Sequence, residues 1–351
     1  MTRMVRQSMV AYATPLCETV VETPEPRGTE VLVRISRCGV CHSDLHLHDG
    51  YFSLGGDKKL DVTAFRSLPF TLGHEIAGVV EKAGPETDVK VGTSAAVFPW
   101  IGCGECAACR AGEENLCAAP RHLGIQVDGG FATHVLVPHP RYLIDHGSLP
   151  ASLAGAYMCS GLTAFAALKR LAEHAKRGPI LLVGLGGVGM MGLAFALALF
   201  PHKPIVADVD PAKRDAALKA GAAAAYDPAD PNARKALIRA TGGGVAGAAD
   251  FAGTDGSLAF AVGSIGKGGK VVITGLIGGS FATPIAMFPL KAMAIEGTMT
   301  GTLAEAEEMM ALARAGKIPP VPIHERPLSA AQASLDDLRS GKIVGRVVLV
   351  P

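Results

Sequence analysis

Hydrophobic and polar residues alternate in short runs before about residue 150. In residues 31–36, Val31, Val33 and Ile35 alternate with Leu32, Arg34 and Ser36, which predicts a half-buried strand. Residues 75–81, 91–98 and 131–137 form similar short runs bounded by Gly, Pro or Asp, and we interpret each as a strand. Few long helical patterns occur here, so the first region is predicted to be rich in β-structure.

The pattern changes near residue 160, where short apolar runs alternate with longer helical ones. Strands are predicted at 180–183, 204–208, 248–251 and 270–274, and helices at 188–199, 212–220, 231–240 and 255–265. Strands that alternate with helices favour right-handed βαβ crossovers and a parallel sheet. After residue 297 the pattern is mixed again, with helices at 303–315 and 329–339 and a strand at 343–350. The simplest architecture is an α/β chain in which a doubly wound domain is inserted into a β-rich one.

Composition and charge exclude several classes of protein. A length of 351 residues suggests about two domains. Lys plus Arg is 33 and Asp plus Glu is 32, so there is no broad basic field for nucleic acid. Residues 180–200 are long and apolar enough for a membrane span, but a buried strand and helix give the same hydropathy, and we expect no membrane association. No secretory signal is visible, so we expect a cytoplasmic protein with reduced thiols.

A glycine-rich loop follows the apolar run at 180–183. Gly184, Gly186 and Gly189 match G-x-G-x-x-G, with Gly187 and Val188 between them. The motif opens a predicted helix, and Asp208 ends the next predicted strand. This context predicts dinucleotide binding, with pyrophosphate at the helix N-terminus. The Asp208 carboxylate would bind the ribose hydroxyls and repel a 2′-phosphate, which favours NAD over NADP. A glycine turn in a nucleotide-free α/β domain is the alternative.

The cysteines form one dense cluster and several dispersed positions. Cys103, Cys106, Cys109 and Cys117 have the spacing C-x2-C-x2-C-x7-C, which fits a closed structural zinc site; a reduced cluster without metal is the alternative. Cys41, His74 and Cys159 are further candidates for metal binding, but their spacing alone does not bring them together. A lone buried cysteine is usually a small hydrophobic residue.

These motifs together resemble those of the zinc-dependent medium-chain alcohol dehydrogenases. GVCHSD at 39–44, LGHE at 72–75, the four-cysteine segment, CSGLTAF at 159–165 and GLGGVG at 184–189 occur in the order of that family. The resemblance covers essentially the whole chain. It implies a GroES-like catalytic domain and a Rossmann domain, bound NAD and two zinc ions per chain. Cys41, His74 and Cys159 would hold the catalytic zinc, and the four-cysteine cluster the structural one.

The same resemblance assigns roles to other residues. Asp44 would orient His74, and Glu75 would be a carboxylate behind the metal that can approach it. Ser43 would hydrogen-bond the alcohol and pass its proton, through the nicotinamide ribose, to a solvent-facing His46. Coenzyme contacts are expected from the side chains of His42, Thr163, Lys213 and Arg346. Pro99 and Trp100 would line the substrate cleft. The remaining histidines are expected to be structural or on the surface.

The resemblance implies an NAD-dependent enzyme that interconverts small alcohols with aldehydes or ketones by hydride transfer from a zinc-bound alkoxide. Primary, secondary, cyclic and benzylic alcohols are all open. A polyol, amino-alcohol or glutathione-adduct dehydrogenase is the alternative enzyme, and a zinc- and NAD-binding protein without catalysis is the non-enzyme alternative. We expect a homo-oligomer, a tetramer rather than a dimer, paired through edge strands near residues 292–298.

The expected domain boundaries are 1–160 and 297–351 for the catalytic domain and 161–296 for the Rossmann domain. Two features depart from the family pattern. The interval from Cys41 to His74 is long, with a surplus at residues 51–67, which would be either a lid over the cleft or an exposed insertion. Cys38 forms an additional C-x-x-C with Cys41, either a redox pair or a packed thiol.

Overall fold

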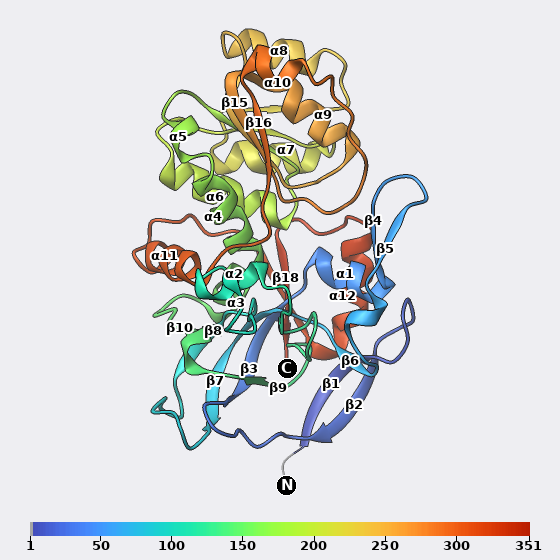
Figure 1. The fold of residues 1–351 in the computed structure, drawn as a ribbon, viewed down its shortest axis with the longest axis vertical. Coiled ribbons are helices and arrows are strands. Elements are labelled where there is room, and N and C mark those ends of the chain that lie inside the picture. Colours follow the sequence, from blue (N-terminus) through green and yellow to red (C-terminus); the bar gives the residue numbers. More distant parts are fainter. Residues whose placement is uncertain (1–2) are drawn as a thin grey trace.

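The computed structural model describes residues 3–351. Two large sheets lie at opposite ends of the molecule, one built from the two ends of the chain and the other from its middle (Figure 1). The C-terminal strand runs back into the first sheet, so the chain leaves that sheet, builds the second and returns. This is the inserted α/β architecture that the sequence predicted.

The first large sheet has seven strands in the order β10-β8-β7-β3-β18-β17, and β9 also pairs with β3. Its strands are Val31–Gly39 (β3), Glu75–Ala83 (β7), Ser94–Val97 (β8), His134–Val137 (β9), Leu143–Ile144 (β10), Ile323–Pro327 (β17) and Arg346–Val350 (β18). The strand expected at 31–36 is present, but the expectation that it is half-buried was wrong at Leu32, which is fully buried. The reason is a register shift between Leu32 and Val33 in the pairing of β3 with β7, which interrupts the strict alternation of the strand.

Smaller elements lie beside this sheet. A three-stranded sheet contains Arg3–Met9 (β1), Cys17–Glu22 (β2) and Phe70–Thr71 (β6). Helix His42–Asp49 (α1) precedes a hairpin of Tyr51–Ser53 (β4) and Lys59–Asp61 (β5), followed by the 3-10 turn Thr63–Phe65. The tip of the hairpin touches the middle region, because a Cβ on Gly55 would lie 2.8 Å from the carbonyl carbon of Gly279. The surplus segment at 51–67 therefore bridges to the Rossmann-type region, and whether it acts as a lid stays a prediction.

The second large sheet has six parallel strands in the order β13-β12-β11-β14-β15-β16. They are Ile180–Val183 (β11), Ile205–Ala207 (β12), Ala224–Tyr226 (β13), Val245–Asp250 (β14), Ile265–Ile273 (β15) and Ala294–Gly297 (β16). Its helices are Leu162–Lys169 (α4), Ala172–Ala175 (α5), Gly187–Leu199 (α6), Pro211–Ala220 (α7), Ala233–Ala240 (α8), Asp255–Ser264 (α9) and Met287–Lys291 (α10).

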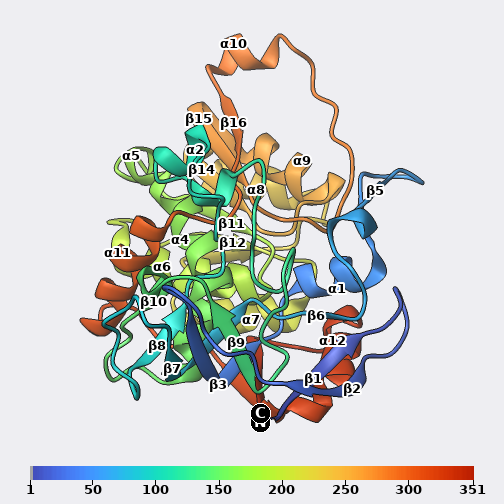
Figure 2. The same ribbon diagram turned by 60° about the horizontal axis from the view of Figure 1, so that its bottom comes forward.

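Alternate residues of these strands enter two separate cores. Leu182 and Val206 belong to the large core that also contains residues of α4 and α6. Leu181 and Val183 face the other way, into a smaller core with residues of α8 and α9. Helices therefore cover both faces of the sheet, as Figure 2 also shows, which explains the continuous apolar runs of its strands.

The remaining helices connect the two sheets or cover the first. They are Ala107–Arg110 (α2), Ala151–Ala156 (α3), Leu303–Arg314 (α11) and Ala331–Arg339 (α12), with the π-helical turn Tyr157–Gly161 (η4) and the 3-10 turns Glu114–Leu116 (η2), Pro140–Tyr142 and Leu328–Ala330. Within residues 3–351, the helical run Ala151–Lys169 has the length and composition of a membrane span, but 94% of its most apolar window is buried. It is therefore a core helix. The apolar stretch at 180–200 divides into β11 and α6, as expected.

Candidate active site

A cavity of about 600 Å³ lies where α1, the carboxyl ends of the parallel strands and the returning C-terminal segment meet. It contains most of the residues expected at the site. Those that line it are Cys41, His42, Ser43, His46, Trp100, Cys159, Thr163, Gly184, Gly186, Gly187, Val188, Gly189, Asp208, Lys213 and Arg346. His74, Asp44 and Glu75 lie fully buried behind its wall. Pro99 is also absent from the lining, although Trp100 beside it faces the cavity.

Three side chains distant in sequence form a compact ligand group. The ligand atoms of Cys41, His74 and Cys159 all lie within 4.8 Å of one another, and the two sulfurs are 3.9 Å apart. Two sulfurs bound to one tetrahedral zinc lie roughly 3.8 Å apart. Both ring nitrogens of His74 are buried and have no hydrogen-bond partner within residues 3–351. A buried nitrogen without a partner, next to two thiols, is what a zinc ligand set requires.

Asp44 holds this group in place from the start of α1. Its carboxylate accepts hydrogen bonds from the backbone N–H groups of Cys41 (2.9 Å) and Gly73 (3.3 Å). Its Oδ1 also lies 3.2 Å from His74 Nδ1, so Nε2 is the ring nitrogen that this pairing leaves available to a metal. Burial lowers the pKa of His74, but the Asp44 carboxylate and the Cys41 sulfur outweigh it, so the pKa is raised overall. The neighbouring Cys159 lowers the pKa of Cys41 and favours its thiolate.

A buried ion pair connects the ligand group to the glycine loop. The Glu75 carboxylate pairs with the Arg346 guanidinium, and it also accepts a hydrogen bond from the backbone N–H of Ser160 (3.2 Å). Burial is the main cause that raises the pKa of Glu75 to about 7. Arg346 packs against the start of α6 so closely that a Cβ on Gly187 would lie 2.6 Å from its Nη1. Arg346 thus lies between Glu75 and the N-terminus of that helix.

The glycine loop has the local geometry of a phosphate-binding turn. A Cβ on Gly189 would lie 1.8 Å from the carbonyl oxygen of Gly184, so only glycine permits α6 to begin this close to β11. Gly186 has open space where its Cβ would be, which leaves room for a ligand. Asp208 follows β12, and its carboxylate accepts hydrogen bonds from the backbone N–H groups of Leu185 (2.6 Å) and Asp210 (2.9 Å). The carboxylate is therefore fixed next to the loop.

His46 differs from its expected solvent-facing position. Its ring packs 4.8 Å from that of Phe52 in β4, so it is half-buried, and its Nε2 is inaccessible and without a hydrogen-bond partner in residues 3–351. Burial lowers the pKa of His46. The surplus segment at 51–67 supplies Phe52, which explains the difference.

The four-cysteine segment forms a second cluster. The ligand sulfurs of Cys103, Cys106, Cys109 and Cys117 lie within 4.8 Å of one another, with individual separations of 3.5 to 3.9 Å. These separations fit a tetrahedral zinc. The backbone N–H of Cys109 donates to Cys106 Sγ and contributes to lowering the pKa of that thiol to about 6. Cys38 and Cys41 are both free and buried, and burial raises the pKa of Cys38, as expected for a packed thiol.

Several residues of the cavity and its surroundings were missed in the sequence. Ile277, Thr298 and Thr300 line the cavity, but they follow no motif and no periodicity. His122, one of the histidines expected to be structural or on the surface, is buried with its ring edge-on to Trp100 at 5.3 Å, and burial lowers its pKa to about 4. Asn115 is also buried, and it contacts the backbone of Met299.

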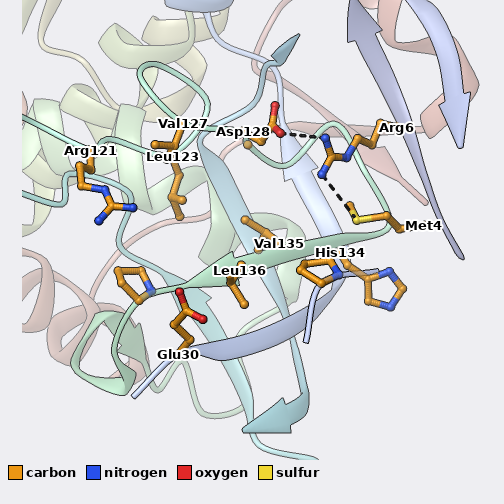
Figure 3. Close-up of a pocket in the computed structure, with 13 residues that line it drawn as sticks. Met4, Arg6, Glu30, Arg121, Leu123, Val127, Asp128, His134, Val135 and Leu136 are labelled. Atoms are coloured by element: carbon orange, nitrogen blue, oxygen red, sulfur yellow. Dashed lines mark hydrogen bonds and ion pairs between the residues drawn. The ribbon is translucent and has the colours of Figure 1, made fainter. Parts of the chain in front are cut away.

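A smaller cavity of about 310 Å³ lies beside β1 and β9, away from the residues described above. Figure 3 shows Arg6 paired with Asp128 on one side of it, and Leu123 and Val135 are among the other residues that line it. The paired atoms of Arg6 and Asp128 are 2.8 Å apart. None of the residues expected at the site lines this cavity.

The comparisons with known proteins agree with this geometry. Residues 27–146 match the alcohol dehydrogenase GroES-like domain, and residues 187–315 match the zinc-binding dehydrogenase family. An NAD-dependent alcohol dehydrogenase of Sulfurisphaera tokodaii is 34% identical over 98% of this chain and 99% of its own. A D-arabinose 1-dehydrogenase (NADP(+)) of Saccharolobus solfataricus is 30% identical over 97% of this chain and 95% of its own.

The solved structures include the alcohol dehydrogenase of Aeropyrum pernix, with a TM-score of 0.86 and 29% identity over 99% of this chain and 100% of that one. The structural similarity covers both large sheets of this chain. The structure contains two groups of side chains that fit zinc, together with the glycine loop. These features and the matches support the assignment of the chain as an NAD-dependent alcohol oxidoreductase. The chain belongs to the zinc-dependent medium-chain alcohol dehydrogenase family.

Proposed function

We propose that this enzyme oxidises small primary and secondary alcohols, cyclic and benzylic ones included, and reduces the corresponding aldehydes and ketones. One observation carries the proposal. The same cavity is lined by Cys41 and Cys159 at one place and by the glycine loop and Asp208 at another. An alcohol at the first and a dinucleotide at the second would share one cavity, as direct hydride transfer requires.

Coenzyme binding is assigned to the residues around the glycine loop. The backbone N–H groups at the start of α6 would bind the pyrophosphate, with His42 and Arg346 as the cationic or polar groups nearby. Asp208 would bind the ribose of the adenosine half, with Lys213 beside it. Thr163 lines the cavity close to the ligand group and would contact the nicotinamide end.

The metals are assigned to the two ligand groups. Cys41, His74 and Cys159 would hold a catalytic zinc, which when bound lowers the pKa of an alcohol and polarises a carbonyl. Cys103, Cys106, Cys109 and Cys117 would hold a structural zinc with no open position. Asp44 would orient His74. Arg346 binds the carboxylate of Glu75, so Glu75 would stay near the ligand group without being one of its three ligands.

Proton transfer is assigned to Ser43 and His46. Both line the cavity, and both lie on α1 close behind Cys41. Ser43 would accept the hydroxyl proton of the alcohol, and His46 would pass it onward. Because burial lowers the pKa of His46, its neutral form is available as a base near neutral pH. The nitrogen that acts would be Nδ1, since Nε2 is inaccessible.

The wall near the ligand group favours apolar alcohols. Trp100, Leu276, Ile277 and Met299 all line the cavity, and Pro99 would support Trp100. A sugar is the second candidate substrate, because one matched relative bears the name of a D-arabinose dehydrogenase. The apolar wall leaves few partners for the hydroxyl groups of a sugar, which is why we place alcohols first.

The decisive experiment follows NADH formation by zinc-replete protein with NAD⁺ or NADP⁺. The panel contains primary, secondary, cyclic and benzylic alcohols, a polyol, an amino-alcohol, a glutathione adduct and D-arabinose. We expect turnover of apolar alcohols with NAD⁺. Preference for D-arabinose or for another polar substrate would replace the proposed substrate class. No turnover by protein with two zinc ions per chain would favour a binding protein that has lost catalysis.

We also propose the domain boundaries 1–160, 161–296 and 297–351, a cytoplasmic location and a homotetramer. The second sheet, from Ile180 to Gly297, falls within the proposed central domain apart from its last residue. Edge strand β16 and the exposed apolar residues Ile285 and Leu290 near it support pairing through residues 292–298. Light scattering on the purified protein tests the tetramer.

A further inference from the structure

Asn115 connects the four-cysteine segment to the wall of the cavity. It lies in the turn η2, two residues before Cys117, and is buried. Its Nδ2 donates a hydrogen bond to the backbone carbonyl of Met299 at 2.8 Å. Because a carbonyl oxygen can only accept, the amide nitrogen must face it. The bond therefore joins two segments that are 184 residues apart in sequence. One is the four-cysteine segment, and the other is the segment that follows β16.

The backbone at this bond is strained. Thr300 follows the Met299 carbonyl directly and has φ of +49°, in the left-handed region that β-branched residues avoid. Such a conformation costs about 1–3 kcal/mol and persists only where the surroundings impose it. Thr298, Met299 and Thr300 all line the cavity, so the strained backbone is part of its wall.

The turn that carries Asn115 is itself firmly held. The buried carboxylate of Glu114 accepts hydrogen bonds from the Gly102 backbone (3.0 Å), Tyr142 Oη (2.7 Å) and Arg141 (2.8 Å). Gly102 follows two residues after Trp100, which lies in the same cavity wall. The four-cysteine segment is thus tied to both Trp100 and Met299.

We propose that Asn115 is a positioning residue that sets the size of alcohol that the cavity accepts. Its carboxamide holds the Met299–Thr300 backbone against the cavity, and without that bond the strained segment relaxes outward. This inference rests on the proposed function and adds a substrate-size limit to it.

The test is Asn115→Asp, which keeps the shape but replaces the donor with a carboxylate facing a carbonyl. We expect the ratio of kcat/KM for cyclohexanol to that for ethanol to rise about tenfold, because losing one buried hydrogen bond changes an equilibrium by roughly that factor. Asn232→Asp is the matched control: Asn232 is the only other asparagine of the chain, and it is exposed. Its ratio should equal that of the unaltered enzyme.

A readout independent of turnover uses Trp100, the only tryptophan of the chain. It is buried, and its Nε1 donates to the Met158 carbonyl at 2.9 Å. Acrylamide should quench its fluorescence more strongly in Asn115→Asp than in Asn232→Asp, since the Met299–Thr300 segment of the wall has opened. The Kd of ADP-ribose should change less than about twofold, because Asp208 and the glycine loop are unaffected.

The outcomes separate the two proposals. An unchanged alcohol ratio and unchanged quenching in an active Asn115→Asp enzyme would overturn the inference. An equal loss for both alcohols together with loss of zinc would also overturn it, since Asn115 would then serve only the four-cysteine segment. If the unaltered enzyme oxidises no alcohol, the proposed function fails, and the quenching comparison still tests the wall. Asn115→Ala, which adds no buried charge, should give the same shift if Asn115→Asp does not fold.

Discussion

Replacing Asp208 with glycine should convert the coenzyme preference of the enzyme. The carboxylate is buried beside the glycine loop and fixed by the backbone N–H groups of Leu185 and Asp210. In Asp208→Gly these two N–H groups lose their acceptor, which we expect to destabilise the fold by about 1–3 kcal/mol. That cost is the same whichever coenzyme binds, so it cancels in a ratio of the two.

The ratio itself changes through two effects with the same sign. NAD loses hydrogen bonds to a charged group, worth about 1.5–3 kcal/mol, or roughly 10- to 150-fold. NADP gains, because a 2′-phosphate no longer meets a carboxylate. We therefore expect the ratio of kcat/KM for NADP⁺ to that for NAD⁺ to rise about 100-fold or more.

Initial rates at a saturating alcohol concentration measure this ratio for both coenzymes. Asp210→Ser is the control, since it removes a carboxylate two residues away but keeps an oxygen at the helix N-cap, where Asp210 now accepts from Ala212. A change below threefold in a folded, zinc-loaded Asp208→Gly protein would refute the assignment of Asp208 to the ribose.

Three further predictions concern the proton path, the four-cysteine segment and a buried histidine. Ser43→Ala should lower kcat roughly 100-fold with zinc unchanged at two per chain; unaltered turnover would remove Ser43 from the path. Cys109→Ser should lower the Tm or the solubility more than kcat, and a stable, fully active variant would contradict a structural zinc. The pKa of His122 falls from 6.5 to about 4 on burial, so the unfolded state takes up the proton first and stability decreases as the pH drops below 6.5. Between pH 7 and pH 5 the enzyme should lose about 2 kcal/mol more than His122→Gln in urea unfolding; equal losses would show that His122 is not held neutral.

The sequence predicted the elements whose patterns depend on local periodicity. The strand at 180–183 and the helices that follow it are present within a few residues of their expected limits. Strand β13 was missed because its residues, Ala224, Ala225 and Tyr226, continue an alanine run with no alternation. Leu32 was expected on a polar face, but a register shift beside it in the pairing of β3 with β7 interrupts the alternation, and the hydrophobic pattern alone does not reveal such a shift.

The residues of the candidate site also divide into those that the sequence predicts and those that it does not. The glycine loop and the four-cysteine segment are each contained in a short stretch, so spacing alone indicates their chemistry. Cys41, His74 and Cys159 come from three separate segments, and only the family resemblance grouped them in advance. No sequence signal points to Asn115 or Thr300, because their relation depends on a contact between distant segments and on a single dihedral angle.

The position of Arg346 in the last strand affects the order in which the protein can mature during translation. Strand β18 lies between β3 and β17 in the first sheet, and its first residue pairs with Glu75. The parallel sheet ends at Gly297, so it can fold on the ribosome while the partner of Glu75 has yet to be made. At about 5–20 residues per second, that interval lasts roughly 2–10 s. During this time Glu75 lacks its counter-ion. A chain truncated before Arg346 should therefore keep a folded coenzyme-binding half, whereas proteases should cleave the half that contains Glu75.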